Sequence, residues 1–102
     1  MAVFKEHIAK LKPGKPYVVG GDLNTLPSHP VIRRLSQTLD LHTGTKKHTT
    51  WTHKGKRRGL IRCNLDHVGT LRSGPLKLID FKMLNRRPSD HSPLLCQFKL
   101  TD

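Results

Sequence analysis

Acidic residues are scarce in this chain, and glutamate occurs only once. Seven Asp and Glu stand against nineteen Lys and Arg in 102 residues, which gives a formal net charge of +12 with neutral histidines. Such an excess predicts a polyanionic partner, namely nucleic acid, a phospholipid surface or a phosphorylated substrate. The alternative is a basic surface that serves only solubility.

Cysteines are few, and long apolar runs are absent from the sequence. Cys63 and Cys96 have no CxxC or finger-like partner, so zinc bound through cysteine is not expected. A disulfide between the two cysteines is the alternative. Nothing else resembles a small secreted scaffold, so we expect a reducing, cytoplasmic location. Residues 1–15 carry charges without the apolar core of a signal peptide. No run approaches the roughly 18 apolar residues of a membrane span, so none is expected.

Hydrophobic residues make up 34% of the chain, counted without glycine. Globular domains usually contain about 45–50% with glycine included. At this length we expect one small domain with a modest core.

A short β-branched run that ends in two glycines stands at the centre of what is present. In Pro16–Leu26, PYVVGGDLNTL, this order is typical of a buried strand that stops at a tight turn. Asp22 and Asn24 follow at i, i+2 spacing, which puts both side chains on one face of an extended backbone. A carboxylate and an amide at the carboxyl end of such a strand predict a site. The alternative is an Asx-turn started by Asp22, with Asn24 in a loop conformation.

Hydrophobic periodicity predicts two short helices and several strands. Helical spacing favours a helix over Ala2–Leu11, and Ser28 as N-cap with Pro30 in the first turn favours a second helix to about Leu39. Strands are expected over residues 16–20, 65–71, 76–84 and 94–100. We expect the core of one sheet to contain six of their apolar residues: Val18, Val19, Leu65, Val68, Leu94 and Leu95.

The segment Thr43–Arg62 contains seven Lys and Arg, no acid and the only tryptophan, Trp51. It is expected to form a basic loop or hairpin. We interpret its positive charge, centred on Lys56, Arg57 and Arg58, as a groove for a phosphate backbone, and a solvated loop is the alternative. Trp51 either stacks on a base or anchors the segment to the core, and we favour anchoring.

Three of the acids stand beside amide or imidazole side chains: Asp22 near Asn24, Asp66 next to His67, and Asp90 next to His91. Carboxylate oxygens are the ligands that Mg²⁺ prefers, and a histidine beside a carboxylate can act as general base. An amide can donate a hydrogen bond to a phosphate oxygen. Together these parts suit hydrolysis of a phosphate ester. The alternatives are a surface residue at a strand start for Asp66 and a simple turn for residues 89–91.

Three ordered motifs resemble a known family. VVGGDLN, LDHV and PSDHSPL match the patterns GD-x-N, [IL]-D-[HY]-[IV] and S-D-H-x-P-[LIV] of the endonuclease/exonuclease/phosphatase superfamily. The match covers Tyr17 to about Leu100 and is similar to the carboxy-terminal half of its exonuclease III and DNase I-like members. It implies an α/β fold, namely half of a four-layer α/β sandwich with a mostly antiparallel sheet and flanking helices. Residues 1–102 would then be a partial domain, and His67, at a variable motif position, would be mainly structural.

The resemblance also implies roles for the matched residues. Asp22 would protonate the leaving oxygen or align the attacking water, and Asn24 would hold the scissile phosphate. Asp90 would be a ligand of Mg²⁺ or Mn²⁺. His91, oriented by Asp66, would contact the phosphate or act as the base. Either Asp22 or His91 would therefore activate the water.

Only half of the family pattern is present. The superfamily's amino-terminal half carries an early Asn and a metal-binding Glu, whereas Glu6 here lies on the predicted first helix. We therefore expect the isolated chain to be inactive or weak, and to need a missing amino-terminal half or self-association.

The +12 charge favours nucleic acid over other phosphate-ester substrates. We therefore expect a metal-dependent phosphodiesterase of the nuclease type. The alternative is a basic nucleic-acid-binding module or an inactive fragment with a degenerate site.

Overall fold

The computed structural model describes residues 2–12, 14–46, 48–55, 59–84 and 90–101. Among the described residues no helix is long and apolar enough to cross a membrane. The elements, in chain order, are α1 (Ala2–Ala9), β1 (Val18–Asp22), α2 (Pro30–Leu35), β2 (Leu39–His42), β3 (Trp51–Gly55), β4 (Gly59–Cys63), β5 (Asp66–Leu71), β6 (Leu76–Met83) and β7 (Leu94–Leu100).

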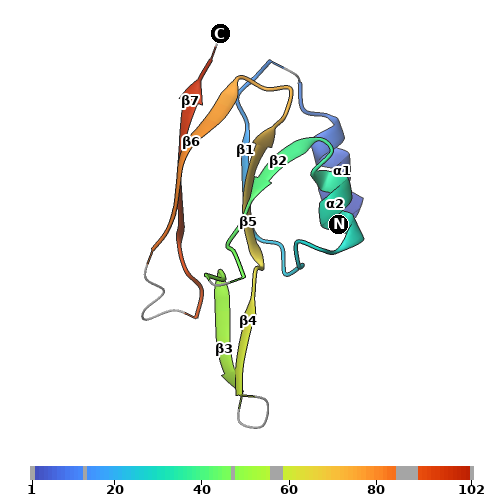
Figure 1. The fold of residues 1–102 in the computed structure, drawn as a ribbon. Coiled ribbons are helices and arrows are strands. Elements are labelled where there is room, and N and C mark those ends of the chain that lie inside the picture. The colour runs from blue at the N-terminus through green and yellow to red at the C-terminus, as the bar shows by residue number, and fades with distance from the viewer. Residues whose placement is uncertain (1, 13, 47, 56–58, 85–89, 102) are drawn as a thin grey trace.

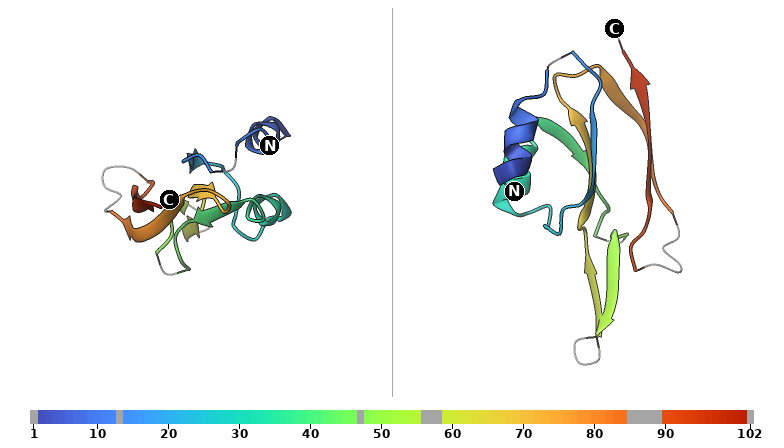
Figure 2. Two further views of the ribbon diagram at one scale, coloured as in Figure 1. Left: turned by 90° about the horizontal axis from the view of Figure 1, so that it is seen from above. Right: turned by 180° about the vertical axis from the view of Figure 1, so that it is seen from behind.

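A three-stranded antiparallel sheet in the order β1-β5-β2 lies at the centre of the molecule. The hairpins β3–β4 and β6–β7 each form a separate two-stranded antiparallel sheet. Both helices lie on one side of the central sheet and the β6–β7 hairpin lies on the other (Figures 1 and 2). The β3–β4 hairpin extends beyond one end of the sheet (Figure 1). This sheet-rich, antiparallel arrangement with short helices is that of a partial α/β domain.

The core lies where the helices meet the central sheet. Ile8 of α1, Leu39 of β2 and Leu71 of β5 form its buried cluster. Gly69 of β5 makes room for the Leu41 side chain of β2, because a Cβ atom there would stand 2.6 Å from Cδ2 of Leu41. Four further apolar side chains pack on the cluster: Leu11, Tyr17, Val19 and Leu41.

The structure confirms most of the predicted elements but shortens the second helix. α2 ends at Leu35, and its N-cap is His29, whose Nδ1 accepts a hydrogen bond from the Val31 N–H at 3.1 Å, rather than Ser28. The Ser36 hydroxyl donates to the Arg33 carbonyl at 2.7 Å and competes with continued helix. Leu39 therefore begins β2, a strand that the sequence did not predict.

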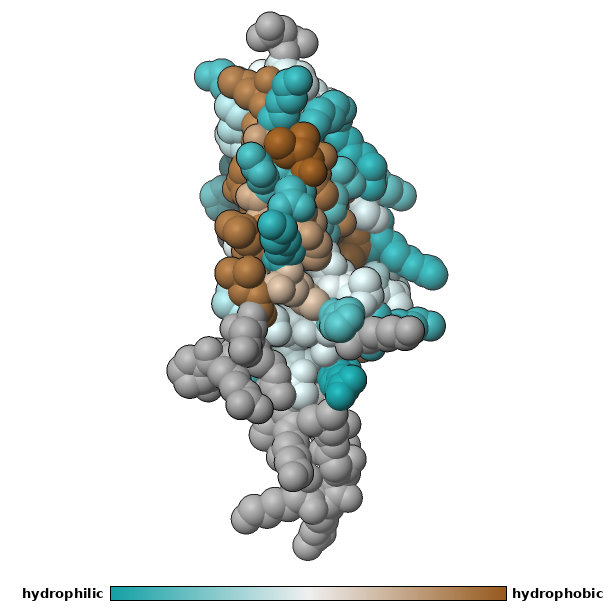
Figure 3. Space-filling model, turned by 60° about the vertical axis from the view of Figure 1, so that its left-hand side comes forward, coloured by the Kyte–Doolittle hydropathy of each residue, from teal (hydrophilic) through white to brown (hydrophobic). Residues whose placement is uncertain are grey.

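Two of the six predicted core residues are exposed, Val18 at 57% and Leu95 at 54%. Side chains alternate between the faces of a strand, so Val19 and Leu94 face inward while their neighbours face out. The prediction of one sheet was also wrong, because β7 pairs with β6 apart from β1 and β5. Figure 3 brings the side of the β6–β7 hairpin forward and shows brown, apolar residues interspersed with teal, polar ones.

Candidate active site

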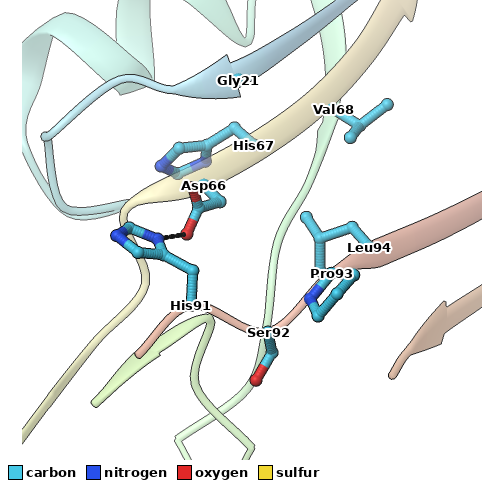
Figure 4. A pocket seen from close by; sticks show the side chains of 8 residues that line it. All are labelled: Gly21, Asp66, His67, Val68, His91, Ser92, Pro93 and Leu94. Atoms are coloured by element: carbon cyan, nitrogen blue, oxygen red, sulfur yellow. Dashed lines mark hydrogen bonds and ion pairs between the residues drawn. The ribbon is translucent and has the colours of Figure 1, made fainter. Parts of the chain in front are cut away.

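An aspartate and a histidine from distant parts of the chain form a close pair. Asp66 is the first residue of β5, and His91 lies shortly before β7. Asp66 Oδ2 and His91 Nδ1 are 2.7 Å apart, and the two side chains point at each other (Figure 4). This distance is typical of a charge-assisted hydrogen bond. The side chains are 18% and 34% exposed, respectively, and both line a pocket of about 330 Å³.

Asp22 joins this pair from the neighbouring strand. The register of β1 and β5 places Asp22 directly opposite Asp66. Asp22 Oδ2 lies 3.9 Å from His91 Nε2, the ring nitrogen away from Asp66. One ligand atom from each of Asp22, Asp66 and His91 lies within 4.8 Å of the others. Two carboxylates and an imidazole therefore converge from three segments of the chain.

Asn24 lies in the turn that follows β1. Its φ is 50°, in the left-handed region that asparagine tolerates. Its N–H donates to Asp22 Oδ1 at 2.7 Å, which makes the turn an Asx-turn. The extended backbone assumed for the i, i+2 argument thus ends before Asn24, and that part of the prediction was wrong. The Asx-turn is compatible with the cluster, because Asp22 accepts the Asn24 N–H at Oδ1 while its Oδ2 lies near His91.

Strand β3 anchors the segment that carries Asp90 and His91. The Trp51 indole N–H donates to Asp90 Oδ2 at 3.1 Å, and Trp51 and His91 form a backbone bridge. The Thr52 N–H donates to the Asp90 carbonyl at 3.0 Å. Asp90 Oδ1 lies 3.9 Å from His91 Nε2. Trp51 thus bonds to the segment of Asp90, whereas its anchoring to the core and its stacking on a base both stay predictions.

The three carboxylates change the charge state of His91. Its pKa is raised, chiefly by the hydrogen bond to Asp66, while burial acts in the opposite direction. The negative charges of Asp66, Asp90 and Asp22 raise the pKa further. A larger share of the rings therefore carries both protons at neutral pH than for an ordinary histidine.

Residues 4–91 match the family model described as Endonuclease/Exonuclease/phosphatase family. The chain belongs to this family. The family consists generally of hydrolytic phosphoesterases and is typically metal-dependent. No curated protein and no solved structure matches the chain. The family match contains every residue of the Asp22, Asp66 and His91 cluster.

The donor set of the cluster fits a hard divalent cation. Carboxylate oxygens suit Mg²⁺ and Mn²⁺, and Asp22 and Asp66 supply them within 4.8 Å of a ring nitrogen of His91. Asp90, which the motif predicts as a metal ligand, is exposed beside this group. Its role as a ligand stays a prediction.

His67, the neighbour of Asp66, faces away from the cluster. It is buried, and its Nε2 lies 3.0 Å from the Thr25 carbonyl oxygen. Successive residues of a strand point to opposite faces, so His67 supports the turn after β1 while Asp66 faces His91. This contact agrees with the mainly structural role expected for His67.

The basic residues predicted to bind substrate, Lys56, Arg57 and Arg58, lie outside the described residues. Two other cations of the same segment, Lys46 and Arg62, are exposed. Both line a separate pocket of about 530 Å³, together with residues 26–28 and 43–45. Positive charge and an open pocket thus occur together near the base of the β3–β4 hairpin.

Proposed function

We propose that this chain carries part of the active site of a metal-dependent phosphodiesterase that acts on nucleic acid. The Asp66–His91 hydrogen bond, with Asp22 facing the second ring nitrogen, is the observation that carries the proposal. A histidine held by one carboxylate and opposed by another suits proton transfer at a phosphate ester. The net charge of +12 supports nucleic acid as the substrate.

His91 acts through Nε2 in this proposal. Asp66 accepts a hydrogen bond from His91 Nδ1–H, which fixes the orientation of the ring and directs Nε2 towards Asp22 and Asp90. A neutral ring would accept a proton from the attacking water at Nε2. A protonated ring would donate a hydrogen bond to a phosphate oxygen there. In the metal-free chain, the raised pKa of His91 increases the share of rings in this protonated form.

Asp22 acts through Oδ2, because Oδ1 is held by the Asn24 N–H. Oδ2 aligns the attacking water as a carboxylate, or protonates the leaving oxygen as an acid. The Asn24 side-chain amide donates a hydrogen bond to the scissile phosphate, where negative charge grows in the transition state. The Asx-turn fixes the spacing between these two groups.

Asp90 would hold Mg²⁺ or Mn²⁺ beside the cluster of Asp22, Asp66 and His91. When bound, the cation neutralises phosphate oxygens and favours ionisation of water. We further propose that the chain is the carboxy-terminal half of a four-layer α/β sandwich in the cytoplasm. Because that half lacks the family's metal-binding Glu, full activity requires an amino-terminal half that carries it.

The metal part of the proposal is tested on the 102-residue chain itself. Adding Mn²⁺ should broaden the NMR signals of Asp22, Asp66 and Asp90 before those of other acids. Asp80, which pairs with Lys82 at 3.5 Å on β6, provides the internal reference. Uniform broadening of Asp80 and the cluster would contradict a site at this place.

The catalytic part is tested on the chain completed by a Glu-bearing amino-terminal half, in cis or in trans. We expect cleavage of DNA that requires Mg²⁺, with little or no activity from the isolated chain on a simple phosphodiester. Asp22→Ala, Asn24→Ala and His91→Ala should each lower kcat by about 10² or more. Asp80→Asn is the matched control and should leave kcat unchanged. Full activity in EDTA would contradict the proposal.

Nucleic-acid binding without cleavage is the second candidate function. The exposed cations Lys46 and Arg62 at an open pocket favour it independently of the acidic cluster. The two functions differ in their dependence on metal. Tight DNA binding in EDTA, together with no cleavage by the completed protein in Mg²⁺ or Mn²⁺, would favour the binding module.

A further inference from the structure

A buried threonine is hydrogen-bonded to both chain segments that carry the Asp66–His91 pair. Thr50 stands immediately before β3 and is 0% exposed, although its side chain is polar. A buried hydroxyl costs free energy unless it is hydrogen-bonded. Thr50 lies outside the three sequence motifs, so only its contacts in the folded chain connect it with the site.

The Thr50 hydroxyl bonds to the beginning of β5. Its Oγ1 accepts hydrogen bonds from the Leu65 N–H at 2.9 Å and from the Asp66 N–H at 3.1 Å. It also donates to the Cys63 carbonyl at 3.5 Å. A hydroxyl has one proton and two lone pairs, so these three contacts use its full capacity. The backbone of Asp66 is thereby held by the side chain of Thr50.

The Thr50 backbone bonds to the segment that carries His91. Its carbonyl accepts a hydrogen bond from the Ser92 N–H at 2.7 Å. Its N–H donates to Asn64 Oδ1 at 3.1 Å, which holds Thr50 itself in place. One residue therefore contacts the chain on both sides of the pair: its hydroxyl reaches Asp66, and its carbonyl reaches the residue next to His91.

We propose that Thr50 is a positioning residue that sets the distance between Asp66 and His91 by holding both of their chain segments. The effect of Thr50 on catalysis rests on the proposed function, whereas its effect on the distance between Asp66 and His91 does not. Thr50→Val keeps nearly the same shape but removes the hydroxyl, which leaves the Leu65 and Asp66 N–H groups unpaired. Thr50→Ser keeps the hydroxyl and should keep the pair.

NMR spectroscopy of the 102-residue chain tests this positioning directly. We expect slow hydrogen exchange of the Asp66 amide and a downfield resonance from the His91 Nδ1 proton. Thr50→Val should speed exchange at Asp66 by about tenfold or more and abolish the His91 resonance, and Thr50→Ser should preserve both. Thr70→Val is the matched control, because Thr70 is a 3% exposed threonine on β5 away from the pair.

Two results would overturn the proposal. One is a Thr50→Val chain that folds and keeps both NMR signatures. The other is a folded wild-type chain whose Asp66 amide exchanges without protection, which needs no variant to fold. In the completed enzyme, Thr50→Val should lower kcat while KM stays unchanged, and Thr50→Ser should restore kcat. A completed enzyme without activity would count against the proposed function and leave the NMR result standing.

Discussion

Two aspartates face each other across the β1–β5 pair in a chain that has few acids. Like charges directly opposite on neighbouring strands destabilise a sheet. Asp22 and Asp66 occupy such positions, and His91 lies against both, 2.7 Å from Asp66 and 3.9 Å from Asp22. Asp66 is hydrogen-bonded and mostly covered, unlike a residue at an exposed strand start. The unfavourable pairing agrees with the proposed site, in which both carboxylates lie beside one imidazole.

The raised pKa of His91 predicts how stability depends on pH. The folded chain binds the His91 proton more tightly than the unfolded chain, whose ordinary pKa is 6.5. The stabilisation from this proton is therefore complete below that value and is lost as the pH rises through the raised pKa. We expect the guanidinium concentration at the unfolding midpoint of the metal-free chain to decrease as the pH rises from 6.5 through the raised pKa of His91.

Two variants isolate the contribution of His91 from that of the other histidines. His91→Gln should reduce the change in midpoint with pH, because the titrating group is absent. His7→Gln changes an exposed histidine on α1 and should keep the wild-type pH dependence. An identical pH dependence for His91→Gln and wild type would show that the carboxylates do not hold this proton.

Sequence motifs could name the acids and the histidine of the site, but not the residue that supports them. Asp22, Asp66 and His91 each lie in a short motif with a distinctive order of residue types. Thr50 lies in a segment with several other threonines, and nothing local distinguishes it from Thr49 or Thr52. Its proposed role arises from contacts with residues 14 to 16 positions away and with the more distant Ser92, which only the fold brings together.

At the scale of elements, periodicity identified strands better than it identified their ends and partners. β7 was predicted at its observed limits, because it is a clear apolar run after a proline. Leu35 and Leu39 fit a helical stripe equally well, so the end of α2 and the start of β2 were missed. Pairing between strands is non-local, which is why the separate β6–β7 sheet could not be derived from alternation alone.

The basic segment Lys46–Arg62 is the part of the chain that we expect to govern binding to polyanions. Changing Lys56, Arg57 and Arg58 together to Ala should weaken DNA binding and flatten its salt dependence. The slope of log K against log salt should fall by roughly one unit for each lost phosphate contact. Binding measured by fluorescence anisotropy over a range of salt concentrations gives this slope.

A second triple variant removes the same charge from another element. Lys77, Lys82 and Lys99 are exposed on the β6–β7 hairpin. Changing these three to Ala should reduce binding only through net charge and should leave most of the salt slope in place. Equal effects of the two triple variants would mean that the segment Lys46–Arg62 has no special role in binding.

At the scale of the molecule, the chain is elongated and its buried core is small. The radius of gyration is 14.8 Å, against about 13 Å for a compact chain of 100 residues. The principal extents are 49 × 29 × 19 Å. The described residues include five buried apolar side chains, and several large ones are exposed: Val18, Leu26, Ile79, Leu84, Leu95 and Leu100. We therefore expect low stability, which an additional half or self-association would increase.

This small core makes stability sensitive to a single charge. Val19 packs on the buried cluster of Ile8, Leu39 and Leu71. An unpaired charge placed there costs several kcal/mol, on the order of the total stability of a small domain. We predict that Val19→Asp unfolds the chain, as measured by circular dichroism at 25 °C.

Val18→Asp provides a control one residue away. Val18 lies on the same strand but is exposed on the opposite face, so a carboxylate there stays in water. This variant should keep the wild-type spectrum with only a small loss of stability, because the chemical change is identical and only the face differs. Equal spectra for the two variants would contradict the assignment of the core to the helix side of β1. A wild-type chain without structure would instead show that the chain does not fold without a partner, and the Val19 test would then use the protein with that partner.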